Sequence, residues 1–444
     1  MGKIFYSKEI NEKYNVDICV AGGGPSGIAA AVAAARQGCS VFLAESQGFF
    51  GGLATTALVP AFMPFDNGVD FLAGGIGREI YDLCVENKFY LSGSTVGIHI
   101  EKYKFICDNL ITREPNITYS FYTNLIDTVK SGGDGDKCDK DKIEYAVFNA
   151  KSGTFAVKAK IFIDCTGDGD LCVFGGNPYS MGDGDGKTMP STLCTIWSGI
   201  NWDDKKFSDE QGLERAFADK LFTQEDRHLP GMWRIGEELG GGNIGHCFGV
   251  DATDEVSLTK AMINGRKILP EYEKYYREYL GRGYKNAGVA ISGSYLGVRE
   301  SRRITGDYEL SEADFINRAS FDDEIGRFSY PIDIHIAKPD KESYEKFRKE
   351  HDTMRYKPGE SYGIPYRILL PVKLSNVYVA GRCVSADKKM QSSIRVMPAC
   401  FIMGQAAGIG ASIAKNTGET RSVNIAELQK KLKDMGAYLP NTRK

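Results

Sequence analysis

The sequence of 444 residues is short of the features that would place it in a membrane, in the secretory pathway or on nucleic acid. No segment approaches the ~18 consecutive apolar residues of a membrane-spanning helix, and the opening MGKIFYSKEI has no apolar core of the kind a secretory signal needs. The formal net charge of −3 is small, so neither nucleic acid nor an anionic membrane is expected as a partner. We therefore expect a cytoplasmic protein without a membrane span.

Metal-binding and dithiol motifs are also missing. The 11 cysteines are scattered singly and no C-x-x-C pair occurs, which excludes a zinc ribbon, an iron–sulfur cluster and a redox dithiol of the usual spacing. We expect no bound metal and mostly buried thiols that pack as small hydrophobic groups. Cys383 and Cys400 fall near the nucleotide site predicted below, where a reactive thiol is the less favoured alternative.

What the sequence does contain is a dinucleotide-binding pattern near its start. Val16–Ala21 reads as a buried parallel strand, and Gly22, Gly24 and Gly27 follow with the spacing G-x-G-x-x-G. The first glycine permits a tight turn, the second lets the backbone approach a pyrophosphate, and the third allows close contact between helix and strand. The alanine-rich helix expected at Ser26–Gly38 would begin beneath the phosphates, where its unpaired N–H groups favour an anion.

An acidic residue completes the pattern. A second strand, Ser40–Ala44, is followed by Glu45, whose carboxylate is placed to accept hydrogen bonds from an adenosine ribose and disfavours a 2′-phosphate there. A second literal match, Gly240–Gly245, follows no buried strand and precedes no alanine-rich helix, so we expect a loop. The chain is therefore expected to hold one dinucleotide-binding fold.

Segments beyond this first unit favour FAD over a nicotinamide. Gly51 and Gly52 come just after the acidic residue, where a flavin lying across the end of the sheet needs backbone close to its ring. Lys160–Leu171 reads as an apolar strand ending in Thr-Gly-Asp. Val377–Ala380 reads as a strand ending in Ala-Gly-Arg, and a helix is expected at Ala399–Lys415. The amino end of that helix would stabilise negative charge on a reduced flavin ring.

These three segments resemble the FAD-binding signatures of the glutathione-reductase-like flavoproteins. Together with RESRRITGDYEL (299–310), YPIDIHI (330–336) and YGIPYRILLP (362–371), they resemble a bacterial family of FAD-dependent oxidoreductases over nearly the whole chain. The resemblance implies non-covalent FAD, with its pyrophosphate at the glycine turn, its ribose at Glu45 and its adenine against the backbone near Leu125. The cofactor-binding residues that it implies are Gly22, Gly24, Pro25, Ser26, Glu45, Ser46, Gly51, Gly52, Leu53, Ala54, Thr55, Leu125, Thr166, Gly167, Gly381, Arg382, Val396 and Met397.

The third signature departs from the family at one position. Many relatives end it in Gly-Asp, whereas this chain has Gly381-Arg382. Because an arginine side chain only donates hydrogen bonds, Arg382 is expected to contact a phosphate or the carbonyl oxygens of the flavin ring. The departure leaves the partner of Arg382 open but not the cofactor.

The fold class that these observations predict is α/β. We expect a Rossmann-like FAD-binding domain with a βββ-type insertion, and a second α+β substrate domain with a mixed or antiparallel sheet. The third FAD signature lies far along the chain, so the FAD domain is placed at residues 1–190 plus 370–444 and the substrate or cap domain at 191–369. Further expected elements are a helix at 101–111, strands at 117–130, Ile143–Asn149, Thr154–Ala159 and Thr192–Ser198, and a helical stretch Ser257–Leu280 that Pro270 can break.

Proton-transfer groups are sought in the substrate domain, because a flavin supplies the redox chemistry and the protein manages protons. His335, in PIDIHI, is the first candidate for a catalytic base. The alternative is that Asp333 and His335 alternate on a strand and only hydrogen-bond locally. His246 is the second candidate. Surface or structural roles are expected for the other histidines, which are His99, His228 and His351.

Arginines near these segments are candidates for holding the substrate. Arg395 precedes the flavin-facing helix and is treated as a candidate catalytic residue. Arg302 and Arg303 are substrate candidates, although arginines that stand among acidic residues more often form structural ion pairs. Tyr366 lies where the chain re-enters the FAD domain and is the third substrate candidate.

The function favoured by these patterns is an FAD-dependent oxidoreductase that moves a hydride between a small organic substrate and N5 of the flavin. The alternatives are a synthase of the thiazole-forming type that holds a dinucleotide as its substrate, an RNA-modifying flavoprotein and a non-catalytic flavoprotein. The RNA-modifying reading needs a basic face that the composition does not indicate. The electron donor or acceptor and the substrate stay open, and homo-oligomerisation is expected only from the general frequency of oligomers.

Overall fold

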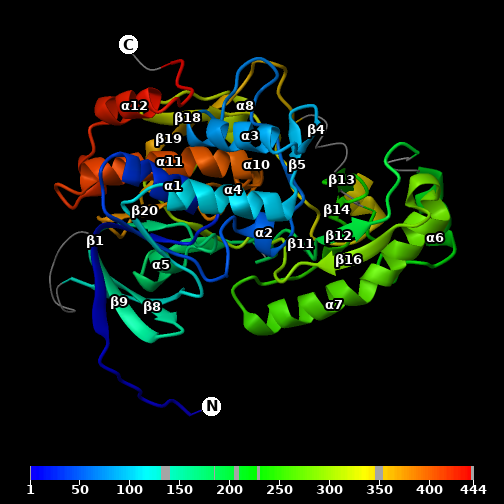
Figure 1. Cartoon of the computed structure of the whole chain (residues 1–444), viewed down its shortest axis with the longest axis horizontal. Helices are drawn as coiled ribbons and strands as arrows, with labels where there is room; N and C mark the ends of the chain where they lie inside the picture. Colours follow the sequence, from blue (N-terminus) through cyan, green and yellow to red (C-terminus); the bar gives the residue numbers. More distant parts are fainter. Residues whose placement is uncertain are drawn as a thin grey trace.

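The computed structural model describes residues 2–131, 141–184, 186–204, 210–227, 231–345 and 354–441 (Figure 1). His228, His351 and Cys138 lie outside the described residues. The helices are α1 (Pro25–Arg36), α2 (Leu53–Thr56), α3 (Ile76–Glu86), α4 (Ile100–Thr112), α5 (Asp170–Phe174), α6 (Glu210–Ala218), α7 (Glu255–Lys274), α8 (Glu312–Ile316), α10 (Lys388–Ile394), α11 (Met397–Ala414) and α12 (Ile425–Asp434), with shorter turns η1 (Tyr275–Leu280), η2 (Arg282–Tyr284), η3 (Tyr366–Leu369) and η4 (Thr420–Ser422).

The strands of the first half of the chain are β1 (Asn11–Ala21), β2 (Val41–Ala44), β3 (Ala61–Phe62), β4 (Tyr90–Ser92), β5 (Thr95–Gly97), β6 (Ile117–Ser120), β7 (Asn124–Lys130), β8 (Ile143–Ala150), β9 (Gly153–Asp164) and β10 (Tyr179–Met181). Those of the second half are β11 (Ser191–Thr192), β12 (Thr195–Ser198), β13 (Met232–Arg234), β14 (Gly240–Gly242), β15 (His246–Cys247), β16 (Gly288–Ser292), β17 (Arg302–Ile304), β18 (Glu324–Phe328), β19 (Tyr362–Pro365) and β20 (Val377–Val379).

A mixed seven-stranded sheet forms the centre of the larger part of the molecule. Its order is β6-β2-β1-β9-β8-β7, and β20 pairs with the end of β9. The strands β6, β2, β1, β9 and β20 run parallel, whereas β8 and β7 are antiparallel to their neighbours. This is the predicted Rossmann-like α/β domain, with β7, β8 and the first half of β9 as its three-stranded insertion.

Two cores lie on opposite faces of this sheet. Ile18 and Val20 of β1 belong to the core that contains the alanines of α1 and most of α11. Cys19 and Ala21, one position along, belong to the core that contains Phe148 and Phe155 of the insertion. Both faces are covered, so β1 is an uninterrupted apolar run rather than an alternating one, as expected of a buried parallel strand.

Helix α11 packs directly on α1. A Cβ on Gly404 would overlap the backbone oxygen of Ser26, and a Cβ on Gly408 would overlap that of Ala30. These two contacts have the same spacing and direction in both helices, so the helices run parallel. At 1.5 Å per residue, the first turn of α11 projects roughly 10 Å beyond the first turn of α1. Within the described residues, α11 is the one helix long and apolar enough to span a membrane, but 83% of its 18-residue window is buried in this packing.

The second sheet contains strands in the order β13-β14-β12-β16, all antiparallel, and lies with α6 and α7 at one side of the molecule (Figure 1). Gly240–Gly242, predicted to be a loop, form the interior strand β14. Glycine is required at these positions. A Cβ on Gly241 would overlap Pro60, and a Cβ on Gly242 would meet the ring of Trp197. The glycines therefore permit close packing of sheet and loop and do not belong to a second βαβ unit.

Two other expectations need correction. Helix α7 continues through Pro270 to Lys274 and widens into the π-helical turn η1 only afterwards. Tyr272 of α7 and Tyr275 and Tyr276 of η1 fill the core of the second sheet, and this packing holds the helix past Pro270. The predicted strand 117–130 is two strands, since Tyr122 adopts φ = 52° between β6 and β7, which lie on opposite edges of the main sheet.

Several boundaries also differ from expectation. The strands expected at Thr154–Ala159 and in Lys160–Leu171 are parts of one strand, β9, and Thr192–Ser198 is divided between β11 and β12. The antiparallel pair β18–β19 lies in the segment assigned to the cap domain, yet Ile325 and Ile364 are buried in the core shared with α1 and α11.

Candidate functional site

The glycine turn after β1 is shaped by backbone contacts that leave no room for side chains. A Cβ on Gly22, which has φ = 101°, would overlap the backbone of Cys165 at the end of β9. A Cβ on Gly27 would overlap the oxygen of Gly22. The first and third glycines of the motif therefore bring strand, turn and helix together as the spacing predicts.

The amino end of α1 is open to an anion. Its N-cap, Gly24, offers no capping side chain, the first turn contains no acidic residue, and Pro25 occupies the first helical position. Gly52 lies against this turn, because a Cβ on Gly52 would be 2.9 Å from the Cα of Gly24. A helix end of this kind presents unpaired N–H groups and a positive dipole to a phosphate.

Glu45 is buried at the end of β2 with a well-defined hydrogen-bond environment. Its carboxylate accepts hydrogen bonds from the N–H groups of Gly23 and Gln47, both at 2.8 Å, and from the hydroxyl of Ser46 at 3.1 Å. Burial raises the pKa of Glu45, while these hydrogen bonds oppose the increase. The carboxylate thus braces the glycine turn, in addition to the ribose contact that the sequence predicts for it.

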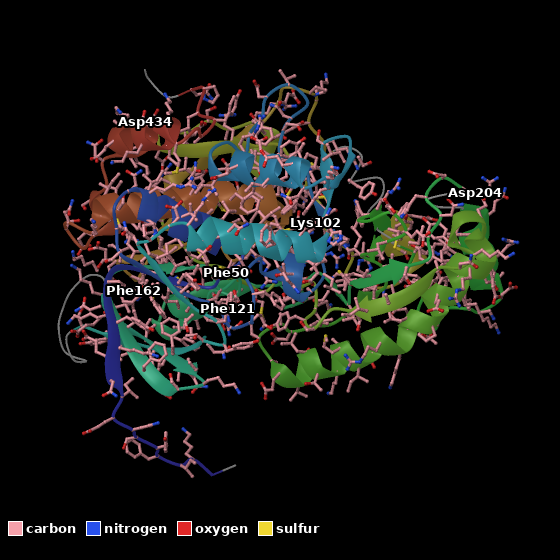
Figure 2. All side chains as sticks on the ribbon, in the orientation of Figure 1. Phe50, Lys102, Phe121, Phe162, Asp204 and Asp434 are labelled. Carbon is pink, nitrogen blue, oxygen red and sulfur yellow. The ribbon has the colours of Figure 1, made fainter. Side chains whose placement is uncertain are left out.

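The aromatic wall beside this turn comes from two loops. Phe50 and Phe121 lie side by side, with ring centroids 4.6 Å apart (Figure 2). A Cβ on Gly23 would lie 2.6 Å from the Phe50 ring. The N–H of Thr123 donates to the oxygen of Glu45, which brings the start of β7, with Leu125, to the predicted adenosine end of the site.

Arg382 has protein partners around the Thr-Gly-Asp turn. Its guanidinium forms an ion pair with Asp168 at 2.5 Å and donates to the backbone oxygens of Gly167 and Val298, at 3.0 and 2.6 Å. Because Asp168 belongs to the Thr-Gly-Asp turn, Arg382 joins the third predicted FAD signature to the second. Arg382 therefore contacts the loop at which the flavin is predicted to lie, and its predicted contact with the cofactor stays a prediction.

The neighbouring acid of the same turn is neutralised in a similar way. Arg302, a substrate candidate, donates to Asp170 at 2.6 Å. Burial and the nearby carboxylates of Asp168 and Asp164 raise the pKa of Asp170 to about 6, against the influence of Arg302. Arg303, another substrate candidate, pairs with the buried Glu300 and donates to Gly182 O. Both arginines serve ion pairs, the alternative that the sequence had favoured.

Tyr366 lies apart from these groups. It is only 2% exposed, and its hydroxyl is shared with Tyr378 and donates to the oxygen of Thr420 at 2.7 Å. A Cβ on Gly410 would come within 3.3 Å of its ring, so Tyr366 packs beneath the second half of α11. This placement is that of a structural tyrosine in the core.

The remaining predicted cofactor residues lie around the same turns. Thr166 accepts a hydrogen bond from the N–H of Asp170 at 3.0 Å and donates to Asp164 at 2.7 Å. A Cβ on Gly381 would lie 2.7 Å from the hydroxyl of Ser26, which donates to Ala380 O. The other predicted cofactor residues lie at two helices. Leu53, Ala54 and Thr55 are in α2 and Gly51 comes just before it, whereas Val396 and Met397 are at the start of α11.

The cysteines near this site have the character of packed thiols. Cys383 and Cys400 are both buried. Burial raises the pKa of Cys400 to about 12 and that of Cys383 further still. A thiolate is therefore strongly disfavoured at both positions, in agreement with the packing role expected from the sequence.

A second group of polar side chains lies at the amino end of α11. Arg395 caps the carboxyl end of α10 and pairs with Asp333, the guanidinium Nη2 being 3.2 Å from Oδ2. The N–H of Asp333 donates to the hydroxyl of Ser392 on α10 at 3.0 Å. Helix α10, which the sequence analysis did not predict, thus holds the segment around Asp333 against the start of α11. Its one sequence signal is Asp387, whose side chain caps the helix by accepting from the N–H of Met390.

His335 is the centre of this group. Its Nε2 lies 3.5 Å from Asp333 Oδ2, and its Nδ1 lies 3.0 Å from Nε2 of His246. The Nδ1 atom of His246 lies 3.1 Å from Oδ1 of Asp226, whose Oδ2 accepts the backbone N–H of His246 at 2.9 Å. The two histidines predicted as first and second candidates are therefore in direct contact. Asp226 was not predicted, and no local pattern marks it.

A cavity of about 420 Å³ opens beside this group. Asp333 lines it, together with polar and aromatic side chains that include Asp66, Asn67, Tyr330 and Arg355. Its lining contains both signs of charge and several hydroxyl groups, so it suits a small polar molecule. Asp333 connects this cavity to His335.

The comparisons with known proteins agree with this picture. The family model described as FAD dependent oxidoreductase matches residues 17–432. The chain belongs to this family. No curated protein matches the sequence.

Two solved structures are similar to this chain over most of its length. A geranylgeranyl bacteriochlorophyll reductase-like protein from Thermoplasma acidophilum is 13% identical, with 96% of this chain and 84% of that chain covered and a TM-score of 0.46. The p-nitrophenol 4-monooxygenase of Pseudomonas putida is 11% identical, with 95% and 84% covered and a TM-score of 0.44. Both identities are low.

FAD is the cofactor of the family, and the residues of this chain fit it. The open first turn of α1 suits the pyrophosphate, and Gly52 keeps the backbone of its turn close to that turn, because a Cβ there would lie 2.9 Å from the Cα of Gly24. The first turn of α11 has neither a capping side chain nor an acidic residue. Two helix amino ends, one projecting beyond the other along the same direction, thus offer positive potential to the two ends of an elongated anionic cofactor.

Proposed function

We propose that this family member moves a hydride between a small polar organic substrate and N5 of FAD, with the cofactor held non-covalently. The observation that carries the proposal is the buried group of Arg395, Asp333 and His335 at the amino end of α11, beside the cavity of about 420 Å³. When bound, FAD supplies two-electron redox chemistry that side chains lack.

The chain's own residues would handle the proton and the charge. His335 is 5% exposed and would take the proton from a substrate O–H or N–H at Nε2, the nitrogen nearer Asp333. Asp333 would orient His335 and stabilise its charged form, while Arg395 pairs with that carboxylate and holds it in place. A substrate carbon bearing a hydroxyl or amino group fits a site with one such base, so alcohols and amines are the favoured classes.

The test is anaerobic absorbance spectroscopy of the purified holoprotein during challenge with alcohols, amines, hydroxy acids and reduced nicotinamides. We expect one class to bleach the flavin band. The variant His335→Gln should retain FAD but bleach roughly 10²- to 10⁴-fold more slowly, because it lacks the base. His99→Gln, at the start of α4 and away from this group, is the matched histidine control and should behave as the wild type.

Two results would contradict the proposal. If no class bleaches a holoprotein that dithionite reduces normally, the oxidoreductase reading fails and a non-catalytic flavoprotein is favoured. If the protein cannot be loaded with FAD at all, the synthase alternative takes its place. Equal rates for His335→Gln and wild type would remove His335 from the reaction while leaving the cofactor assignment intact.

A further inference from the structure

Several separate stretches of the chain line the cavity of about 420 Å³. They come from residues 63–68, from Ser94 and Thr95 at the start of β5, from residues 329–333 and from residues 355–358. The proposed function places a substrate here, but it does not specify what that substrate carries besides its hydroxyl or amino group. The lining side chains with unused hydrogen-bonding capacity identify that further group, because buried polar atoms need partners.

Two hydroxyl groups of the lining already donate to the protein. The hydroxyl of Ser94 donates to Oδ1 of Asp66 at 3.0 Å, and this oxygen also accepts the backbone N–H of Gly68 at 2.8 Å. The hydroxyl of Tyr356 donates to the backbone oxygen of Phe315. Both hydroxyls can accept a hydrogen bond from a bound molecule but have no proton left to donate. A donor for that molecule must therefore come from another side chain.

Asn67 lines the cavity and supplies such a donor. It is 9% exposed, and its Oδ1 accepts the backbone N–H groups of Val69 and Asp70, at 3.1 and 2.7 Å. These two contacts fix the orientation of the amide, so Nδ2 is its free end. Within the described residues, Nδ2 has no hydrogen-bond partner. An unsatisfied buried donor is costly, and an oxygen atom of a molecule in the cavity would remove that cost.

The segment 355–358 packs directly on the turn that contains Asn67. The N–H of Gly359 donates to the backbone oxygen of Asn67 at 3.0 Å. A Cβ on Gly68, which has φ = 83°, would lie 3.3 Å from Cβ of Pro358. The side chains of this segment that line the cavity are therefore held next to the donor amide.

Two of these side chains are positively charged. Lys357 and Arg355 both line the cavity. The nearest acid along the chain, Glu360, accepts the backbone N–H of Lys357 at 2.9 Å and pairs with Arg318 at 2.9 Å. The ammonium group of Lys357 forms no ion pair with any residue that the structure describes. Its charge is thus available to a bound molecule, and Arg355 adds a second positive charge on the same segment.

We propose that the substrate carries a carboxylate group, which is bound by Nδ2 of Asn67 and by the side chains of Lys357 and Arg355. A hydrogen-bond donor beside two cations is complementary to an oxygen atom with negative charge. Because the carboxylate of Asp66 lines the same cavity, a singly charged group is favoured over a doubly charged phosphate. The substrate class is therefore hydroxy acids or amino acids rather than simple alcohols or amines. This inference rests on the proposed function for the reaction but not for the binding.

The experiment is an anaerobic binding titration of the FAD-loaded protein, followed by ligand-observed NMR. The ligands are 2-hydroxy acids and 2-amino acids of increasing side-chain size, each matched with its carboxamide, which keeps the shape and removes the negative charge. We expect at least one acid to bind at least about 10-fold more tightly than its carboxamide. Equal binding of acids and carboxamides would overturn the proposal, and so would tighter binding of inorganic phosphate than of every acid. Absence of binding by all acids at about 10 mM would overturn it as well.

Two variants then test the residues. Asn67→Asp keeps an oxygen for the N–H groups of Val69 and Asp70 but replaces Nδ2 by a second oxygen with negative charge. Acids should bind it at least about 10-fold more weakly, whereas carboxamides should not, because their N–H groups can donate to the new carboxylate. Lys357→Met should weaken acid binding about 3- to 10-fold, and Lys260→Met, on α7 and outside the cavity lining, is the matched control. Wild-type affinity for acids in both Asn67→Asp and Lys357→Met would contradict the inference.

Binding and bleaching separate this inference from the proposed function. Acids that bind through these residues but never bleach the flavin would support the carboxylate site and contradict the hydride transfer. A simple alcohol or amine that bleaches the flavin as readily as the matched hydroxy acid or amino acid would support the hydride transfer and overturn the carboxylate assignment.

Discussion

At the scale of single residues, two arginines of the site pair with the carboxylates of one turn. Arg382 binds Asp168 of the Thr-Gly-Asp turn. Arg302 does the same for Asp170. The turn places several carboxylates close to the predicted site of an anionic cofactor, and these two guanidiniums offset their negative charge. The sequence revealed the unusual arginine, but the partner depends on a contact between segments more than 200 residues apart, as the separation of 214 positions between Arg382 and Asp168 shows.

The substitution Arg382→Met tests this pairing. It leaves Asp168, whose side chain is 17% exposed, without its guanidinium, and repulsion from the FAD phosphates should weaken FAD binding by about 2 kcal/mol, roughly 30-fold. Titration of apoprotein with FAD, followed by quenching of flavin fluorescence, measures the change. The double variant Arg382→Met/Asp168→Asn should recover much of the loss. If the double variant binds FAD no better than the single one, Arg382 acts on the cofactor directly.

At the scale of elements, the first βαβ unit could be predicted, although β1 begins at Asn11 and not at Val16, because its strand, glycines and alanine-rich helix all follow from local physical rules. Helix α10 could not, since its residues, KKMQSSI, lack an apolar repeat and are buried by several segments distant in the chain, among them the one around Asp333. Strand β14 was mistaken for a loop for a related reason. Its three glycines have no strand propensity, and close approach of Pro60 is what selects them.

The contact between α1 and α11 supplies a prediction at this scale. The substitution Gly404→Ala places a methyl group on the backbone oxygen of Ser26, so the two helices must separate. We expect a loss of about 2–3 kcal/mol in the free energy of unfolding, together with weaker FAD binding, because the amino end of α11 shifts relative to α1. Urea denaturation and FAD titration measure the two effects.

Gly184→Ala provides the control for that substitution. Nothing lies within 4 Å of a Cβ at Gly184, so stability should change by only a few tenths of a kcal/mol. If Gly404→Ala were as stable as Gly184→Ala, the prediction would be wrong, because the two helices would then accommodate a methyl group at their contact.

At the scale of the whole molecule, one charged group joins two adjacent central strands of the main sheet to the end of the helix α11. Asp17 on β1 accepts hydrogen bonds from Lys160 on β9, at 2.8 Å, and from Lys415 after α11, at 3.3 Å. Burial opposes ionisation, but these lysines and the N–H of Ser40 lower the pKa of Asp17 to about 2. Contacts of this kind between distant segments could not be predicted from the sequence, because no local pattern marks them.

The pH dependence of stability follows from that lowered pKa. A carboxylate whose pKa is lower in the folded state stabilises the fold above its unfolded pKa, about 3.9, and loses this contribution as the pH falls toward 2. Asp17→Asn should therefore lower the free energy of unfolding by about 1 kcal/mol at pH 7, since the group is partly exposed. Thermal or urea unfolding from pH 7 to pH 2 should show wild type and variant converging at the acidic end. A constant difference across this range would show that packing, rather than charge, accounts for the loss.

The hydroxyl of Ser26 donates to the oxygen of Ala380, a residue 354 positions later in the chain. A ribosome that adds roughly 5–20 residues per second would reach Ala380 about 20–70 s after Ser26. Throughout that interval the alanine face of α1 emerges from the exit tunnel without the helix that later covers it, and the nascent chain offers this surface to chaperones. Capture of FAD would accordingly be among the last events of biosynthesis, and a cell short of riboflavin would accumulate chains that have been translated but not yet closed around their cofactor.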